Sequence, residues 1–214
     1  MPSRYPFDHL QAVRQLRQSH PHMAALIAAV GRFRLEIVPH ESPYQSLFHS
    51  IQYQQLHGAA AAAILARIKQ QIGDGAIPAP RTLLAAGDER LRASGVSRQK
   101  IAALRDLAEK TLAGAVPDWV GLQRLSDDAI IQRLTQVRGV GIWTVQMLLI
   151  FRLGRPDVWP VLDYGVRHGY QLAFHKRRMP TPAELTRLGQ PLRPWRSVAA
   201  WYCWQQVRLS RLPQ

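Results

Sequence analysis

The stretch LTQVRGVGIWTVQMLLIFRLGRPDVWPVLD, residues 134–163, decides the fold. At its centre stands the triplet Gly139–Val140–Gly141, and the apolar run Ile142–Phe151 follows at once without a helix breaker. Two glycines two positions apart let the backbone turn tightly and approach a ligand closely. The amides that start the second helix, at the positive end of its dipole, form an anion site. The stretch predicts a helix hairpin that can hold a phosphate, although the spacing alone also fits a plain connector between helices.

A helix is predicted directly before the two glycines. Its apolar side chains recur at spacings of three and four residues, the signature of one helix face, at Ile130, Ile131, Leu134 and Val137. Ser126 precedes this run as a candidate N-cap, and the acidic Asp127 and Asp128 would complement the helix dipole.

The chain is strongly basic, with 28 Lys and Arg against 14 Asp and Glu and a formal net charge of +14. A domain with this excess is expected to meet a polyanion, and nucleic acid is the usual one. The charges are scattered, which also fits a generally basic protein. A cluster of basic residues in and after the hairpin stretch nevertheless favours a surface that follows a phosphate backbone. The cluster consists of Arg152, Arg155, Arg167, His168, Lys176, Arg177 and Arg178.

The chain holds a single cysteine, Cys203, which excludes an intrachain disulfide and any site built from several cysteines, including a four-cysteine iron–sulfur cluster. We expect it to be an inert buried thiol. The N-terminal sequence MPSRYPFDHLQAVRQ has no apolar signal segment, and no long run of apolar residues occurs. A cytoplasmic protein without a membrane span is therefore expected, and 214 residues suit one compact domain or two small lobes.

Helical patterns dominate the chain and no alternating strand pattern persists, so the predicted fold class is all-α. The expected helices cover residues 8–17, 21–31, 44–57, 59–72, 81–86, 88–94, 98–114, 119–125, 127–137, 143–151, 163–175, 182–188 and 195–209.

Four blocks, in order along the chain, carry a family resemblance. They are YQSLFHSIQYQQLHGAAAAAILARI from Tyr44, GVSRQKIAALRDLA from Gly95, VRGVGIWT…LLIFRLGRPDVWPVLDYGVRHG from Val137, and RPWRSVAAWYCWQ from Arg193. Together they resemble the helix-hairpin-helix (HhH-GPD) DNA glycosylase superfamily, and within it the DNA-3-methyladenine glycosylase II branch. His57 stands where that branch usually has serine, and Arg138 stands where a proline often precedes the glycines. Both departures leave the backbone function of the hairpin in place.

The resemblance implies a two-lobed helix-hairpin-helix glycosylase fold, with DNA in a cleft between the lobes. We therefore expect N-terminal helices over residues 1–43 that pack with the C-terminal lobe, a central helical domain with the hairpin over 44–154, and a C-terminal lobe over 155–214 that carries the catalytic aspartate. A monomer is expected, and no cofactor is expected to be required. The resemblance also implies that the backbone carbonyls of Thr135, Val137 and Val140 can hold a monovalent cation that bridges to a DNA phosphate.

Asp163 is the candidate catalytic residue. It follows the apolar segment 158–162 and starts a predicted helix, where the residues alone favour a simple N-cap. The resemblance implies catalysis, because the branch carries its catalytic aspartate just past the segment that here reads GRPDVWP. Asp157 is the rival, and its place in a short turn after Pro156 favours a capping or turn role.

One carboxylate suffices for the expected reaction. Cleavage of the bond between base and deoxyribose builds positive charge on the sugar, which a fixed anion stabilises, and the same group can take a proton from the attacking water. Alkylated purines such as 3-methyladenine and 7-methylguanine are already cationic and leave without strong acid assistance. In lyase-type relatives a lysine of the second hairpin helix attacks the sugar, whereas Trp143 stands there in this chain and cannot form a Schiff base. A monofunctional glycosylase is predicted.

A base inside a duplex must be flipped out and its gap filled. The resemblance places the gap-filling residue in the helix that carries Gln54, Gln55 and Leu56, with Gln55 the favoured wedge, and the alternative is a pair of glutamines that cap neighbouring loops. Aromatic side chains offer a cation–π surface to a charged base. The candidates for this substrate pocket are Trp143, Tyr53 and Trp195, with core packing as the alternative for the last two. The candidates for DNA phosphate binding are Gly139, Val140, Gly141 and Thr144.

The sequence thus predicts a DNA repair glycosylase that starts base excision repair on DNA with alkylated bases, at the nucleoid of a bacterial or archaeal cell. The alternative is a non-enzymatic, basic helix-hairpin-helix DNA-binding protein. That alternative explains the charge and the hairpin, but it does not explain an acid in aromatic surroundings, because a carboxylate there repels DNA.

Overall fold

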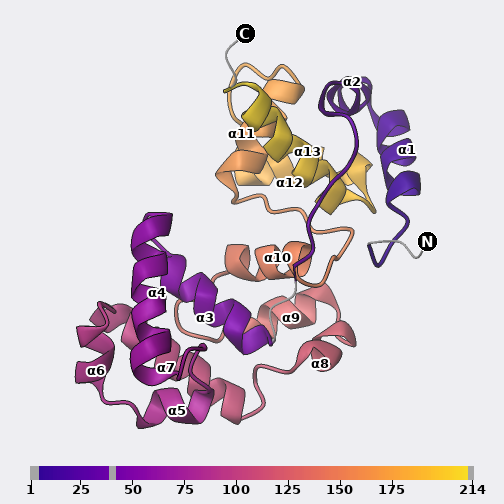
Figure 1. The fold of residues 1–214 in the computed structure, drawn as a ribbon. Coiled ribbons are helices and arrows are strands. Elements are labelled where there is room, and N and C mark those ends of the chain that lie inside the picture. Colours follow the sequence, from indigo (N-terminus) through magenta and orange to yellow (C-terminus); the bar gives the residue numbers. More distant parts are fainter. Residues whose placement is uncertain (1–4, 39–41, 212–214) are drawn as a thin grey trace. The chain divides into compact units, whose positions relative to one another are not determined.

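A computed structural model describes residues 5–38 and 42–211. Residues 1–4, 39–41 and 212–214, which belong to the predicted N-terminal and C-terminal segments, lie outside the described residues. Within that part of the chain every regular element is a helix (Figure 1), so the predicted all-α class is confirmed. The helices are α1 (His9–Ser19), α2 (Pro21–Val30), α3 (Pro43–Tyr53), α4 (Gly58–Ile72), α5 (Pro80–Ala85), α6 (Asp88–Ala93), α7 (Arg98–Leu112), α8 (Trp119–Gln123), α9 (Asp127–Leu134), α10 (Ile142–Phe151), α11 (Tyr164–Ala173), α12 (Pro182–Leu188), the 3-10 helix η1 (Gln190–Leu192) and α13 (Arg196–Leu209).

The chain forms two compact units. Unit 1 combines residues 1–38 with 146–214, and unit 2 comprises residues 39–145. Their border falls inside α10, between Val145 and Gln146, and not at residue 154, where the sequence expectation ended the central domain. Helix α10 has no glycine or proline, so nothing in its sequence marks this border.

Unit 1 is built around α13, on which α11, α2 and α1 pack. Gly169 of α11 permits a close approach, because a Cβ at this position would lie 2.0 Å from the carbonyl oxygen of Cys203. The middle of α13 is enclosed, and every residue from Ser197 to Cys203 is buried.

Unit 2 is built around α7, against which α3, α5 and α6 pack. Ser126 is the N-cap of helix α9, and its hydroxyl accepts a hydrogen bond from the amide of Ala129 at 3.2 Å. The N-cap expected from the sequence is therefore confirmed, and it sets the start of the helix that leads into the hairpin.

The helix expected over residues 44–57 is wrong at its end, because α3 stops at Tyr53. Gln54 has a ψ of 134° and Gln55 a φ of 54°, so the chain turns there. Two contacts distant in sequence accompany this turn. Nζ of Lys100 donates to the carbonyl of Gln52 at 2.6 Å, and the side-chain amide of Gln54 donates to the carbonyl of Gly139 at 2.8 Å. The predicted wedge segment thus lies in a turn and not in a helix.

Candidate functional site

Asp163 caps helix α11. Its Oδ1 accepts the amide of Val166 at 2.8 Å, so the N-cap role suggested by the residues is confirmed. The same oxygen accepts the indole Nε1–H of Trp204 at 2.8 Å. Two donors on one oxygen, one from the backbone of α11 and one from a side chain of α13, fix the orientation of this carboxylate.

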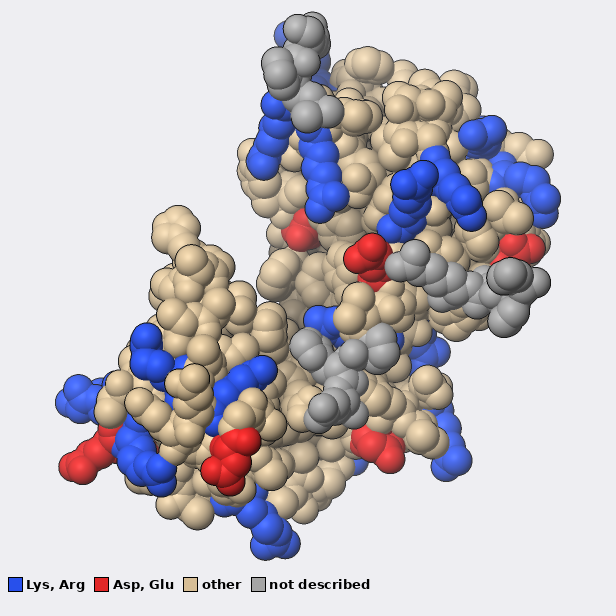
Figure 2. Space-filling model, viewed as in Figure 1, with Lys and Arg blue, Asp and Glu red and all other residues tan. Residues whose placement is uncertain are grey.

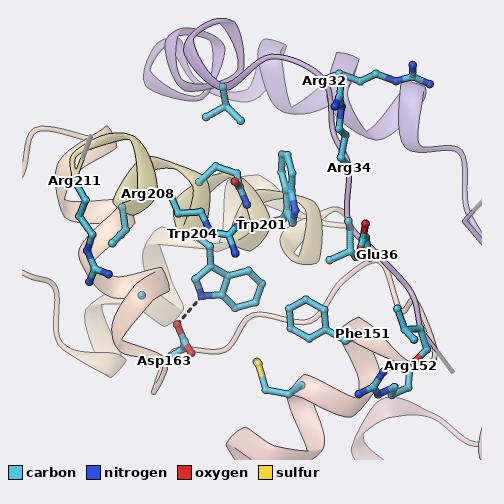
Figure 3. A pocket seen from close by; sticks show the side chains of 17 residues that line it. Arg32, Arg34, Glu36, Phe151, Arg152, Asp163, Trp201, Trp204, Arg208 and Arg211 are labelled. Atoms are coloured by element: carbon cyan, nitrogen blue, oxygen red, sulfur yellow. Dashed lines mark hydrogen bonds between the residues drawn. The ribbon is translucent and has the colours of Figure 1, made fainter. Parts of the chain in front are cut away.

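Asp163 lines an open cavity of about 1210 Å³ in unit 1. At its side, Phe151 stacks on Trp204, with ring centroids 5.4 Å apart and planes inclined by 28° (Figure 3). Trp201 lines the same cavity. Aromatic rings beside a carboxylate suit a planar, cationic group, which gains both ring contacts and charge attraction. The other lining residues are Val30, Arg32, Arg34, Leu35, Glu36, Val38, Met147, Arg152, Gly165, Gln205, Val207, Arg208 and Arg211.

The lining of this cavity is also rich in arginine. Arg32 and Arg34 belong to the segment that follows α2, and Arg208 and Arg211 belong to the end of α13 and the turn after it (Figure 3). In Figure 2, Lys and Arg side chains (blue) outnumber Asp and Glu (red) on the visible face of each unit. This charge suits a nucleic-acid backbone outside a cavity whose interior carries a carboxylate.

Asp157, the rival carboxylate, is engaged in ion pairs. Its two oxygens accept Nε and Nη2 of Arg196 at 2.6 and 2.9 Å, and Nε of Arg193 lies 3.5 Å away. It also accepts the backbone amide of Arg196 at the start of α13. Asp157 is not among the residues that line the Asp163 cavity. The structure gives it the capping role that its turn position indicated.

The hairpin between α9 and α10 is a tight turn. The amide of Val137 donates to the carbonyl of Leu134 at 3.1 Å, and the amide of Val140 donates to that of Val137 at 3.0 Å. Gly139 has a φ of +77°, a conformation that favours glycine. Gly141 has a different role, because a Cβ there would meet nothing within 4 Å. The first glycine shapes the turn, and the second leaves the start of α10 open to a ligand.

A carboxylate of α7 supports this turn from inside unit 2. Asp106 accepts the backbone amide of Arg138 at 2.7 Å and pairs with Lys110 at 2.5 Å. Burial raises the pKa of Asp106, but these hydrogen bonds outweigh it, and the net pKa lies below its ordinary value. A proline at position 138 would lack the amide hydrogen that this bond uses. The departure from the family pattern at Arg138 therefore has a structural reason.

The remaining candidates of the hairpin were predicted to bind a phosphate or a cation. Thr144 is only 6% exposed, so its side chain cannot contact DNA and only its backbone remains a candidate. Thr135 is the C-cap of α9, and the carbonyl of Val137 accepts one hydrogen bond, from Val140. Since a carbonyl oxygen has two lone pairs, acceptor capacity remains at the end of α9, where the last helical carbonyls lack helical partners. The role of these carbonyls as ligands of a monovalent cation stays a prediction. Among residues 5–38 and 42–211, no group of three or more His, Cys, Asp or Glu could hold a metal ion.

The predicted wedge residues form the exposed tip of the α3–α4 turn. Gln55 is exposed with a φ of 54°, and Leu56 is 38% exposed. A left-handed conformation at a residue other than glycine costs about 1 kcal/mol, and such strain gathers at functional positions. Gln54 instead bonds the hairpin through Gly139. Of the two glutamines, Gln54 has the loop-capping role and Gln55 faces solvent.

The three predicted aromatic residues have separate surroundings. Trp143 lies in the first turn of α10, in unit 2, and is 45% exposed. Tyr53, also in unit 2, stacks on His49 with ring centroids 4.0 Å apart. The role of Trp143 and Tyr53 in the substrate pocket stays a prediction.

The third candidate, Trp195, shares unit 1 with Asp163 but is absent from the cavity lining. Its ring contacts Phe7, and its indole N–H donates to the side-chain oxygen of Gln15. The structure therefore favours the packing alternative for Trp195.

The aromatic residues that do accompany Asp163 were missed from the sequence. Trp201 and Trp204 lie in the fourth block and Phe151 ends the apolar run after the glycines, but none of the three was a site candidate. Their spacing of three residues places Trp201 and Trp204 on one helix face, but the sequence does not show which face of this helix meets Asp163.

None of the helices in the described part of the chain has the length and apolar character that a membrane span requires.

Comparisons with known proteins agree on one family. The family model described as HhH-GPD superfamily base excision DNA repair protein matches residues 48–194. DNA-3-methyladenine glycosylase 1 of Schizosaccharomyces pombe is 38% identical over 186 residues, covering 86% of this chain and 82% of that protein. The structure of the S. pombe 3-methyladenine DNA glycosylase Mag1 in complex with abasic DNA has a TM-score of 0.83 and 35% identity, covering 95% of this chain and all of that chain. A DNA-3-methyladenine glycosidase from Bacillus halodurans gives a TM-score of 0.84 at 32% identity, covering 95% and 92% of the two chains. The chain therefore belongs to the HhH-GPD superfamily of base excision DNA repair proteins.

Proposed function

We propose that this protein is a monofunctional DNA glycosylase that removes alkylated purines, of the 3-methyladenine and 7-methylguanine type, as the first step of base excision repair. The observation that carries the proposal is Asp163, an acid held by two hydrogen bonds to one oxygen in a cavity with aromatic walls. A relative named DNA-3-methyladenine glycosylase 1, which is similar to this chain over 82% of its own length, supports the substrate class.

The proposed chemistry is hydrolysis. Water attacks C1′ of the deoxyribose, the bond from C1′ to the base breaks, and the base leaves with the bonding electrons. The carboxylate of Asp163 stabilises the positive charge that builds on the sugar and accepts a proton of the water. An alkylated purine already carries positive charge, so no second acid is needed for its departure. Phe151 and Trp204 offer ring surface to such a base.

DNA binding rests on the backbone of the hairpin and on the wedge. In this proposal the amides at the start of α10, from Gly141 onward, hold a DNA phosphate, and Gln55 fills the gap left by the flipped nucleotide. The carbonyls of Thr135, Val137 and Val140 would hold a monovalent cation, which supplies positive charge to the same phosphate. The protein acts as a monomer on chromosomal DNA in the cytoplasm, without another cofactor.

The absence of lyase activity rests on position 143. The relatives that cleave the DNA backbone attack the sugar with a lysine, and Trp143 cannot serve as that nucleophile. No lysine occurs between Thr111 and Phe174.

The test is release of free bases from DNA treated with dimethyl sulfate, resolved by chromatography. The unchanged protein should release 3-methyladenine and 7-methylguanine. Asp163→Asn should reduce release at least 100-fold, or about 3 kcal/mol, because the charge that stabilises the transition state is lost. Binding to DNA should persist, since asparagine also caps a helix and a repulsive charge is gone.

Asp157→Asn is the matched control. It removes a carboxylate of the same unit that is bound in ion pairs. We expect lower stability with nearly unchanged release per folded molecule. DNA binding by the unchanged protein without any base release would instead establish the non-enzymatic alternative, and normal release by Asp163→Asn would refute the assignment of Asp163.

A further inference from the structure

The carboxylate of Asp163 is held by a residue distant in sequence as well as by its own helix. The amide of Val166 reaches Oδ1 because Asp163 is the N-cap of α11. The indole Nε1–H of Trp204 reaches the same oxygen at 2.8 Å from α13, as the dashed line in Figure 3 marks. A carboxylate is planar, so two donors that fix one oxygen also fix the direction of the other.

The approach of this indole depends on a glycine. A Cβ at Gly165 would lie 2.7 Å from Cδ1 and 3.1 Å from Nε1 of Trp204, and 3.2 Å from Oδ1 of Asp163. Gly169 follows one helical turn later, and a Cβ there would lie 2.0 Å from the backbone of Cys203. The two glycines share one face of α11. They let this helix meet α13 closely enough for Trp204 to reach the acid.

The ring of Trp204 is also held by stacking. Phe151 stacks on Trp204 with ring centroids 5.4 Å apart, so the indole has little freedom to rotate away. An indole N–H is a donor only and keeps its proton at every physiological pH. It therefore stays available as a donor to the carboxylate throughout that range.

We propose that Trp204 is a positioning residue for the catalytic acid, and that Gly165 provides the clearance that lets the indole N–H of Trp204 hold Asp163 in one orientation. This inference rests on the proposed function, in which Asp163 faces the sugar. The backbone amide of Val166 holds the carboxylate from its own helix, and the indole of Trp204 adds a donor from a second helix. With the second donor the acid is held before the substrate arrives, and preorganisation of this kind raises the rate of the chemical step.

The principal test is Trp204→Phe, which keeps an aromatic ring against Phe151 while it removes the indole N–H together with the second ring. Single-turnover base release should fall about 10-fold to 100-fold, the effect of a misplaced catalytic group. The change should appear in kcat, with KM for the damaged duplex nearly unchanged. The acid limb of the pH–rate profile should move to higher pH, because the ionised carboxylate has lost a hydrogen bond that favours it.

Trp159→Phe is the matched control. Trp159 lies in the same unit, is buried, and donates its indole N–H to the carbonyl of Leu185 at 2.8 Å. Removal of this buried donor should lower the melting temperature, while the pH–rate profile stays unchanged. A merely structural role for Trp204 predicts the same pattern in both variants, and that result would overturn the proposal.

A second pair of variants keeps the test valid if Trp204→Phe folds poorly. Gly165→Ala pushes the indole from the acid, whereas Gly189→Ala presses on the control indole, since its Cβ would lie 2.4 Å from Nε1 of Trp159. Only Gly165→Ala should shift the pH–rate profile. Equal profiles for the two alanine variants would count against the proposal.

An observation independent of turnover completes the test. The Nε1–H resonance of Trp204 in 15N-labelled protein should move on acid titration and should differ in Asp163→Asn, whereas that of Trp159 should not. A Trp204 resonance that ignores Asp163 would show that the hydrogen bond is absent. These results separate two failures, because normal turnover of Asp163→Asn refutes the proposed function, whereas an inactive Asp163→Asn with a normal Trp204→Phe refutes only the positioning role.

Discussion

Gly141→Val tests whether the hairpin anchors DNA through its backbone. The substitution should leave the fold intact, since a Cβ at Gly141 meets nothing within 4 Å and its φ is not left-handed. Gly139 would be an unsuitable site, because its φ of +77° strains any side chain and its Cβ would lie 3.3 Å from that of Ala103. The cost to folding at Gly141 is that of a poor N-cap, about 1 kcal/mol.

The effect on binding follows from what the valine covers. Its side chain occupies the space through which a phosphate would reach the first amides of α10. A hydrogen bond to a charged group contributes about 1.5–3 kcal/mol. The loss of one such bond raises Kd roughly 10-fold to 100-fold, at 1.4 kcal/mol for each factor of ten. The loss should be equal for damaged and undamaged duplexes, because a phosphate contact carries no information about the base.

Fluorescence anisotropy with two duplexes of one sequence, one with an abasic-site analogue, measures both affinities. Gly87→Val is the matched control, since Gly87 is the N-cap of α6 and its Cβ also meets nothing within 4 Å. The first turn of α6 carries Asp88 and Glu89, which repel a phosphate, so this variant should bind both duplexes normally. Unchanged affinities in Gly141→Val, or a loss confined to the damaged duplex, would refute the reasoning.

Three further predictions concern the wedge, the chemistry and acid sensitivity. Gln55→Gly should keep or raise the melting temperature, because glycine adopts the φ of 54° without strain, but it should slow base release from duplex DNA. A fall in both the melting temperature and the rate of base release would argue against a wedge. Borohydride added during turnover should trap no efficient covalent complex with DNA, since Trp143 stands at the lysine position, and strong stoichiometric trapping would contradict this. His20 accepts the amide of His22 at the start of α2, and burial, followed by the nearby charges of His22 and Lys176, lowers its pKa below 6.5. Its contribution to stability is therefore complete above pH 6.5 and is lost as the pH falls, so thermal melts at pH 7.5 and 5.5 should differ more for the unchanged protein than for His20→Asn.

Local signals in the sequence were sufficient for most of the fold. Ser126 and Asp163 cap their helices, as their positions at the starts of predicted helices indicated, because an N-cap bond spans only three residues. The end of α3 could not be predicted in this way. The chain leaves the helix at Gln54 with no glycine or proline, and the accompanying bonds come from Lys100 and to Gly139, far along the chain.

The candidate site likewise contains one residue that the sequence predicted and others that it did not. Asp163 was found because the residues around it match a family pattern. Its aromatic partners could not be chosen, because α13 is buried on all sides from Ser197 to Cys203 and shows no apolar stripe that would orient it. The candidate from this block was Trp195, which the structure places outside the cavity lining. The hydrogen bond from Trp204 to Asp163 depends on how α11 crosses α13, which only the structure shows.

The burial of Cys203 makes this enzyme convenient for thiol chemistry. It is the only cysteine in the chain, it is 0% exposed, and burial, with a smaller effect from the charge of Asp163, raises its pKa. Maleimides and disulfides react with the thiolate, so the native thiol of Cys203 should not react with either. A cysteine placed at Gln55 or Gly141 would then be the sole reactive handle. Fluorophores, spin labels or thiol-bearing oligonucleotides could be attached at a chosen point of the proposed DNA-binding surface without first removing the native cysteine.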